Sequence, residues 1–148
     1  TILAEFLGFY LNIILQNVKV VGVGISDVFE QMINVGEGDL VIGIGFPRYA
    51  TKTIDALAFT RDRGASVVAI TDSLLSPLAS KADYTLIAQS NMASFVDSLV
   101  APLSLINGLI IAVGMREKEK TSDIFTSLEE IWTNYNVYSY NKNLGDER

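Results

Sequence analysis

The stretch FPRYATKT, residues 46–53, holds side chains that could bind an anion. Arg48 brings a guanidinium group, while Tyr49, Thr51 and Thr53 bring hydroxyls. An apolar run precedes the stretch and a helical pattern follows from Thr51, so it joins a buried strand to a helix N-terminus. A helix N-terminus beside an arginine suits a phosphate or a carboxylate. Equally, Thr51 could cap the helix and Arg48 could pair with an acidic neighbour or a partner subunit. The sequence leaves both interpretations open.

A second polar loop, TDSLLSP, follows another apolar run. Thr71, Asp72, Ser73 and Ser76 offer hydroxyl and carboxylate groups that could bind the hydroxyls of a sugar. The alternative is capping and turn formation, which Asp and Ser commonly serve. The alternative is favoured for Ser76, because Pro77 follows it at a position typical of a first helical residue.

Composition excludes several kinds of chemistry. The 148 residues include 11 Lys and Arg, 17 Asp and Glu, and neither His nor Cys. Ser-His-Asp triads, Cys-His nucleophiles and the common zinc hydrolases are therefore excluded. The net charge of −6 argues against direct binding of nucleic acid by this chain. We therefore predict no catalytic residue, no metal ligand and no cofactor. An aldose–ketose isomerase stays as the alternative, with Asp72 as the only carboxylate in these loops that could act as its base.

Two glycine motifs imitate a dinucleotide-binding fingerprint. They are GVGISD (residues 22–27) and GIGFPR (residues 43–48), and both lack the third glycine. The interpretation that we favour is close packing of helices on the sheet, made possible by Gly22, Gly24, Gly43 and Gly45.

The remaining pattern predicts the elements that position these loops. Continuous apolar runs predict strands at residues 18–24, 39–45, 66–71 and 84–88. Helical spacing of apolar residues predicts helices at residues 1–16, 27–35, 51–63, 97–115 and 121–137. Ser26 is the expected cap of the second helix, and Gly64 is expected to end the third. Residues 116–123 are expected to form a solvated joint, and residues 141–148 a frayed tail.

Strands that alternate with helices and lack period-two polarity predict a parallel sheet buried on both faces. The expected fold is α/β, a three-layer doubly wound sandwich spanning residues 1–140. Such sheets bind ligands at the carboxyl ends of their strands, where the two polar loops would meet.

The long apolar stretch before Arg116 approaches the length of a membrane span. Its Pro102, Asn107 and Gly108 favour a buried helix instead, and we expect no membrane partner. The helices predicted at residues 1–16, 97–115 and 121–137 together carry more apolar surface than one small sheet can cover, which predicts self-association.

The run from Gly38 to Ser90 resembles the sugar isomerase (SIS) domain, and more narrowly the effector domain of RpiR-type transcriptional regulators. The resemblance is carried by FPRY (residues 46–49), GASVVAITDS (64–73), SPLASKAD (76–83) and SFVDSLVAPLSLINGLI (94–110). It covers residues 18–115.

This resemblance implies a cytoplasmic homodimer or higher homo-oligomer that senses a phosphorylated sugar. DNA would be bound only through a separate N-terminal helix-turn-helix domain. The family also has a strand and a glycine-serine loop before the first helix, so we expect Thr1 to begin a fragment that lacks this N-terminal strand.

The sequence departs from the family at the phosphate loop. Gly45 and Pro47 replace the usual serines, and Ala50 stands where Ser or Thr is common. Other residues of the two loops must then supply the contacts. The predicted ligand-binding residues are Gly45, Arg48, Tyr49, Thr51, Thr71, Asp72 and Ser73. A dimerisation module with a vestigial pocket is a third hypothesis, beside the sensor and the isomerase.

Overall fold

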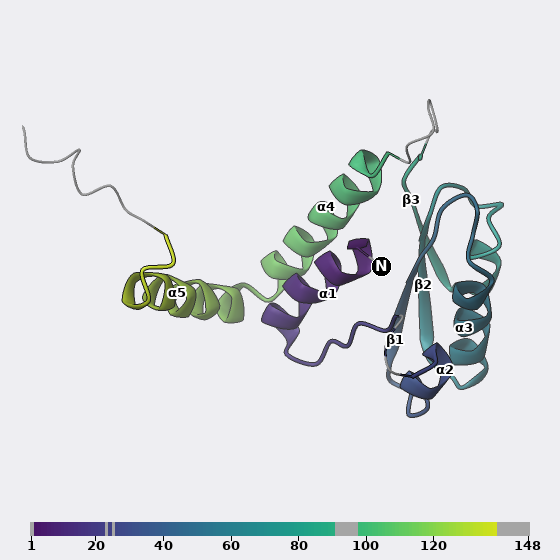
Figure 1. Ribbon diagram of the computed structural model, residues 1–148, viewed down its shortest axis with the longest axis horizontal. Coiled ribbons are helices and arrows are strands. Elements are labelled where there is room, and N and C mark those ends of the chain that lie inside the picture. Colours follow the sequence, from purple (N-terminus) through teal and green to yellow (C-terminus); the bar gives the residue numbers. More distant parts are fainter. Residues whose placement is uncertain (1, 23, 25, 91–97, 139–148) are drawn as a thin grey trace, which may run out of the picture.

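The computed structural model describes residues 2–22, 24, 26–90 and 98–138. The predicted tail at residues 141–148 lies outside these residues, as does the predicted start of the long helix at Asp97. Figure 1 shows a sheet with helices on both faces and a last helix that extends away from this body.

The sheet contains the parallel strands β1 (Leu40–Ile44), β2 (Ser66–Thr71) and β3 (Tyr84–Ile87), in the order β1-β2-β3. Ile44 lies opposite Ile70, and Thr71 lies opposite Ile87. The strands predicted from residue 39 onward are confirmed to within a residue or two at each end.

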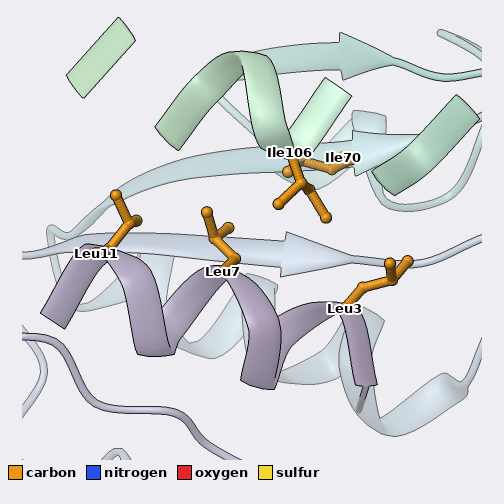
Figure 2. Close-up of a cluster of buried hydrophobic side chains, with 5 residues drawn as sticks. All are labelled: Leu3, Leu7, Leu11, Ile70 and Ile106. Carbon is orange, nitrogen blue, oxygen red and sulfur yellow. The ribbon is translucent and has the colours of Figure 1, made fainter. Parts of the chain in front are cut away.

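Alternate residues of β2 face two different apolar clusters. Val67 and Ala69 pack with Leu57 of α3 (Thr51–Asp62) on one face. Ile70 faces the opposite cluster, which is formed with α1 (Ile2–Leu15) and α4 (Val100–Arg116). Figure 2 shows the buried members of this second cluster, which are Leu3, Leu7, Leu11, Ile70 and Ile106. The three-layer α/β architecture with a parallel sheet is therefore confirmed.

The helix caps explain where the shorter elements begin and end. Gly64 follows α3 with a φ of +88°, the left-handed conformation expected after a helix end. The short helix α2 (Val28–Gln31) is capped by Asp27, whose carboxylate accepts the N–H of Phe29 while Glu30 completes a capping box. The prediction of Ser26 as the cap was wrong by one residue.

The predicted strand at residues 18–24 was also wrong. Its described residues form no strand, and side chains tie the segment to its neighbours instead. Asn12 Oδ1 accepts the Val18 N–H, and Gln31 Nε2 donates to the Gly22 carbonyl at 2.8 Å. An apolar run becomes a strand only where a neighbouring strand takes its backbone hydrogen bonds, and no described strand pairs with this one.

The predicted joint at residues 116–123 is almost entirely helical. Only Glu117 separates α4 from the last helix, α5 (Lys118–Asn134). The Thr121 hydroxyl lies 3.0 Å from the carbonyl oxygen of Gly114 and stabilises this bend. Earlier in the chain, a short 3₁₀ helix, η1 (Ala79–Lys81), lies between β2 and β3. Within the described residues no single helix is long and apolar enough to cross a membrane. Only α4 and α5 taken together have the length and composition of a membrane span, and these two helices are bent by 104° relative to each other.

Candidate functional site

The loops after β1 and β2 meet at the carboxyl end of the sheet. The Tyr49 hydroxyl, from the first loop, donates a 2.6 Å hydrogen bond to Asp72 Oδ1 in the second. Thr71 also donates its hydroxyl to Asp72 Oδ1, at 3.2 Å. These contacts join two loops that are 23 residues apart in sequence.

The surroundings of Tyr49 keep its hydroxyl protonated. The hydrogen bond to the Asp72 carboxylate raises the pKa of Tyr49 above its ordinary value, and burial raises it further. The Tyr49 ring packs against the cluster of Leu57, Val67 and Leu78 on the α3 face. Tyr49 is therefore a fixed hydrogen-bond donor at neutral pH.

Arg48 lies beside this pair with an exposed side chain. Its φ of +68° is left-handed, a conformation that costs free energy in a residue with a Cβ. Within the described chain, ion pairs of 4.0 Å or less involve Lys52, Arg61 and Lys120, and none involves Arg48. The predicted alternative, pairing of Arg48 with an acidic neighbour, is not seen among these residues.

Thr51 is the first residue of α3 and is exposed. The N-cap is Ala50, which has no capping side chain, and its carbonyl accepts the N–H groups of Thr53 and Ile54 at 3.0 and 3.3 Å. The first N–H groups of the helix, those of Thr51 and Lys52, are left without an intrahelical acceptor. The alternative in which Thr51 caps the helix is thus not what the structure has.

Lys52 is a cation at this helix end that was not among the predicted site residues. Its ammonium lies 2.7 Å from Asp27 Oδ2. This hydrogen bond raises the pKa of Lys52 and lowers the pKa of Asp27. The pair fastens α2 to α3, so Lys52 is committed to a neighbour within the chain.

Gly45 has a packing role. Its N–H donates to the Ile70 carbonyl at 3.0 Å, and an added Cβ would lie 2.7 Å from Leu78 Cδ2. Gly43 is similar, since its Cβ would lie 2.6 Å from Leu57 Cδ1. The packing interpretation of these two glycines is confirmed, whereas a Cβ on Gly24 would meet nothing closer than 3.9 Å.

The serines of the second loop form turns. Ser73 Oγ accepts the Leu75 N–H at 3.1 Å, and the buried Ser76 accepts the Ala79 N–H at 3.2 Å. Thr71 is fully buried, so its hydroxyl orients Asp72 and does not reach the surface.

Four of the exposed or half-buried polar residues of these loops, Arg48, Tyr49, Thr51 and Asp72, form what we call the rim. A guanidinium beside free helix N–H groups suits an anion. The Asp72 carboxylate, already bonded at one oxygen, keeps acceptor capacity for hydroxyl donors. Spacing could predict these residues individually, but the Tyr49–Asp72 contact is tertiary and leaves no local signal.

Comparison with known proteins gives a consistent family. A sequence model of the SIS domain matches residues 1–112. An uncharacterized HTH-type transcriptional regulator of Caldanaerobacter subterraneus subsp. tengcongensis is 30% identical over 101 residues, which are 66% of this chain. The chain spans only 35% of that regulator's length.

Two solved structures extend this result. The sugar isomerase domain of an RpiR transcription factor from Sphaerobacter thermophilus has a TM-score of 0.80 and 31% identity, covering 87% of this chain and 72% of that one. The Vibrio vulnificus NanR protein, solved in complex with ManNAc-6P, has a TM-score of 0.71. At 20% identity over 90% of this chain and 52% of its own, the NanR structure shows a shared fold alone.

Proposed function

Because the chain belongs to the SIS domain family, and within it to the RpiR-type regulators, we propose that it is the ligand-sensing effector domain of a transcription regulator. The proposed ligand is a phosphorylated sugar. The observation that carries the proposal is the hydrogen bond by which Tyr49, between Arg48 and the first turn of α3 in the chain, holds the Asp72 carboxylate of the second loop.

Each rim residue has a separate part in this proposal. The phosphate binds the Arg48 guanidinium, the Thr51 hydroxyl and the N–H groups at the start of α3. A sugar hydroxyl donates to Asp72, which Tyr49 and the buried Thr71 keep in place. Of the other predicted residues, Gly45 contributes close packing, because its N–H is already bonded to Ile70. Ser73 shapes the loop through its turn.

Several properties of the whole protein are part of the same proposal. The relative from Caldanaerobacter is an HTH-type regulator, so we place DNA binding in a separate N-terminal domain of the full protein and the protein in the cytoplasm. Exposed apolar side chains on α1, α4 and α5, among them Phe9, Met115 and Phe125, support a homodimer or a higher homo-oligomer.

The proposal assigns no catalysis to the rim. Aldose–ketose isomerisation needs a general base placed at the substrate carbon. Asp72 is the one carboxylate that we assign to the rim, and the two hydroxyls bonded to it suit a fixed acceptor.

Calorimetric titration with a panel of hexose 6-phosphates and N-acetylhexosamine 6-phosphates tests this function. We expect at least one to bind, and its unphosphorylated counterpart and inorganic phosphate to bind at least about tenfold more weakly. Arg48→Ala should weaken binding by about tenfold or more, because charged hydrogen bonds contribute about 1.5–3 kcal/mol. Arg116→Ala removes the same charge from the exposed end of α4 and should leave the affinity unchanged.

Two results would count against the proposal. Absence of binding at millimolar concentration across the panel would favour the vestigial pocket. Exchange of the proton at C2 of the bound sugar with solvent deuterium would favour the isomerase.

A further inference from the structure

The last helix, α5, contacts α1 and α4 but leaves much of its apolar face exposed. Its 17 residues include apolar side chains at helical spacing, and none of its residues is buried. Phe125 is 59% exposed and Tyr135 is 79% exposed. The other members of this face are Ile124, Leu128, Ile131 and Trp132. Helices of this kind gain most of their stability from packing of the apolar face, so α5 needs a partner surface.

The bend after α4 keeps α5 away from its own sheet. The two helices meet at an angle of 104° with only Glu117 between them. The hydroxyl of Thr121 bonds the carbonyl of Gly114 across the bend. Figure 1 shows α5 projecting from the end of α4 that is farther from β3. Its apolar face therefore cannot reach the sheet of the same protomer.

A groove of complementary character lies at the other end of α4. It runs between β3 and α4 and has a volume of about 540 Å³. Its apolar wall includes Leu86 and Leu109, and its floor on α4 includes the small residues Ala101, Ser104 and Gly108. A Cβ on Gly108 would meet nothing within 4 Å. Small side chains at this spacing allow another helix to approach closely.

We propose that α5 of one protomer packs its apolar face into the α4–β3 groove of a second copy of this chain, and that the exchange is reciprocal. This inference rests on the self-association included in the proposed function and assigns it a surface. Both helices are 17 residues long, so one can lie along the other. Reciprocal contacts also close the assembly as a two-fold dimer.

The area that the exchange would bury supports a stable dimer. Phe125 and Trp132 on α5, and Tyr135 at its C-cap, can each bury up to roughly 150–250 Å² when fully covered. Two reciprocal contacts, with the groove surfaces added, bring the total into the range of about 1,200–2,000 Å² found in specific interfaces. A single unreciprocated contact would fall below that range.

Cysteine cross-linking tests the exchange directly, because the chain has no cysteine of its own. Gly108→Cys and Leu128→Cys are made in separate chains, mixed and oxidised. We expect a disulfide-linked heterodimer. Thr126→Cys replaces Leu128→Cys as the control, since Thr126 lies about 200° around the helix from Leu128. Equal cross-linking by both cysteines, or cross-linking by neither, would overturn the inference.

Sedimentation of Phe125→Glu gives a second readout. We expect the dimer to dissociate into monomers. The circular dichroism spectrum should lose at most the helical signal of α5, because no buried core residue lies on α5. Thr126→Glu should stay dimeric. If Phe125→Glu stays dimeric, this inference is wrong, while self-association and sugar-phosphate binding remain as proposed. Sugar-phosphate binding and cross-linking are measured independently, so failure of one proposal is distinguishable from failure of the other.

Discussion

Among the described residues, the hydrogen bond between Tyr49 and Asp72 is the one side-chain hydrogen bond that joins the two rim loops. We predict that Tyr49→Phe lowers the free energy of unfolding by about 1 kcal/mol at pH 7. This is below the usual range for a bond to a charged group, because the pair is partly exposed to solvent. Urea unfolding of both proteins measures the difference. Tyr10→Phe, on an exposed face of α1, is the matched control and should change little.

The pH dependence of this effect follows from the raised pKa of Tyr49. The folded state holds the phenol in its neutral form, whereas the unfolded chain ionises near the ordinary value of 10. The stabilising contribution is therefore complete below pH 10 and is lost as the pH rises through the folded pKa. The stability gap between wild type and Tyr49→Phe should narrow above pH 10 in alkaline unfolding experiments. A gap that widened there would contradict the contact.

Arg48 combines an unfavourable backbone conformation with the proposed ligand contact. Glycine adopts a φ of +68° without a steric penalty, so Arg48→Gly should raise the free energy of unfolding by up to about 1 kcal/mol. It should also abolish the guanidinium contact and weaken sugar-phosphate binding as Arg48→Ala does. Arg48→Ala keeps a Cβ and should not share the gain in stability. Loss of stability in the glycine variant would show that the Arg48 side chain is held by the fold.

At the scale of elements, Gly43 in β1 decides how closely Leu57 of α3 can approach the sheet. Gly43→Ala should destabilise the fold by about 1–3 kcal/mol, because its methyl would lie 2.6 Å from the buried Leu57. Gly114→Ala, in α4, should instead stabilise by about 0.5–1 kcal/mol, since its nearest atom would be 3.8 Å away. Thermal unfolding of the two variants should therefore shift in opposite directions.

Elements with a local signal could be predicted from the sequence, and those that depend on distant partners could not. The strands from residue 39 onward and helix α3 were predicted closely, because continuous apolar runs and Gly64 mark them. Residues 18–24 have the same apolar character but lack a described strand to pair with. The joint predicted at residues 116–123 is confined to Glu117 in the structure, and its shortness depends on the Thr121 hydroxyl, which reaches back seven residues to Gly114.

At the scale of the whole molecule, the site was predicted as a set of loop residues and not as an arrangement. Parallel topology explains why loops after β1 and β2 come together, which the sequence indicates. It does not indicate that Thr71 is fully buried or that the Gly45 N–H is used by the sheet. These differences arise because strand register decides which groups face outward. The proposed function therefore keeps direct ligand contact for Arg48, Thr51 and Asp72, and gives the other predicted residues supporting roles.

Sensing requires that the ligand and the association of protomers affect each other. If a sugar phosphate favours one dimer geometry, it should shift the dimer dissociation constant by about 5–150-fold, the usual range of coupling between sites. Coupling is reciprocal, so the monomeric Phe125→Glu variant should bind the same sugar phosphate more weakly or more tightly by a corresponding factor. Sedimentation equilibrium with and without ligand, and calorimetry on Phe125→Glu, give the two values independently. Equal dissociation constants with and without ligand would mean that rim and interface act separately, and the signal to a DNA-binding domain would then need another route.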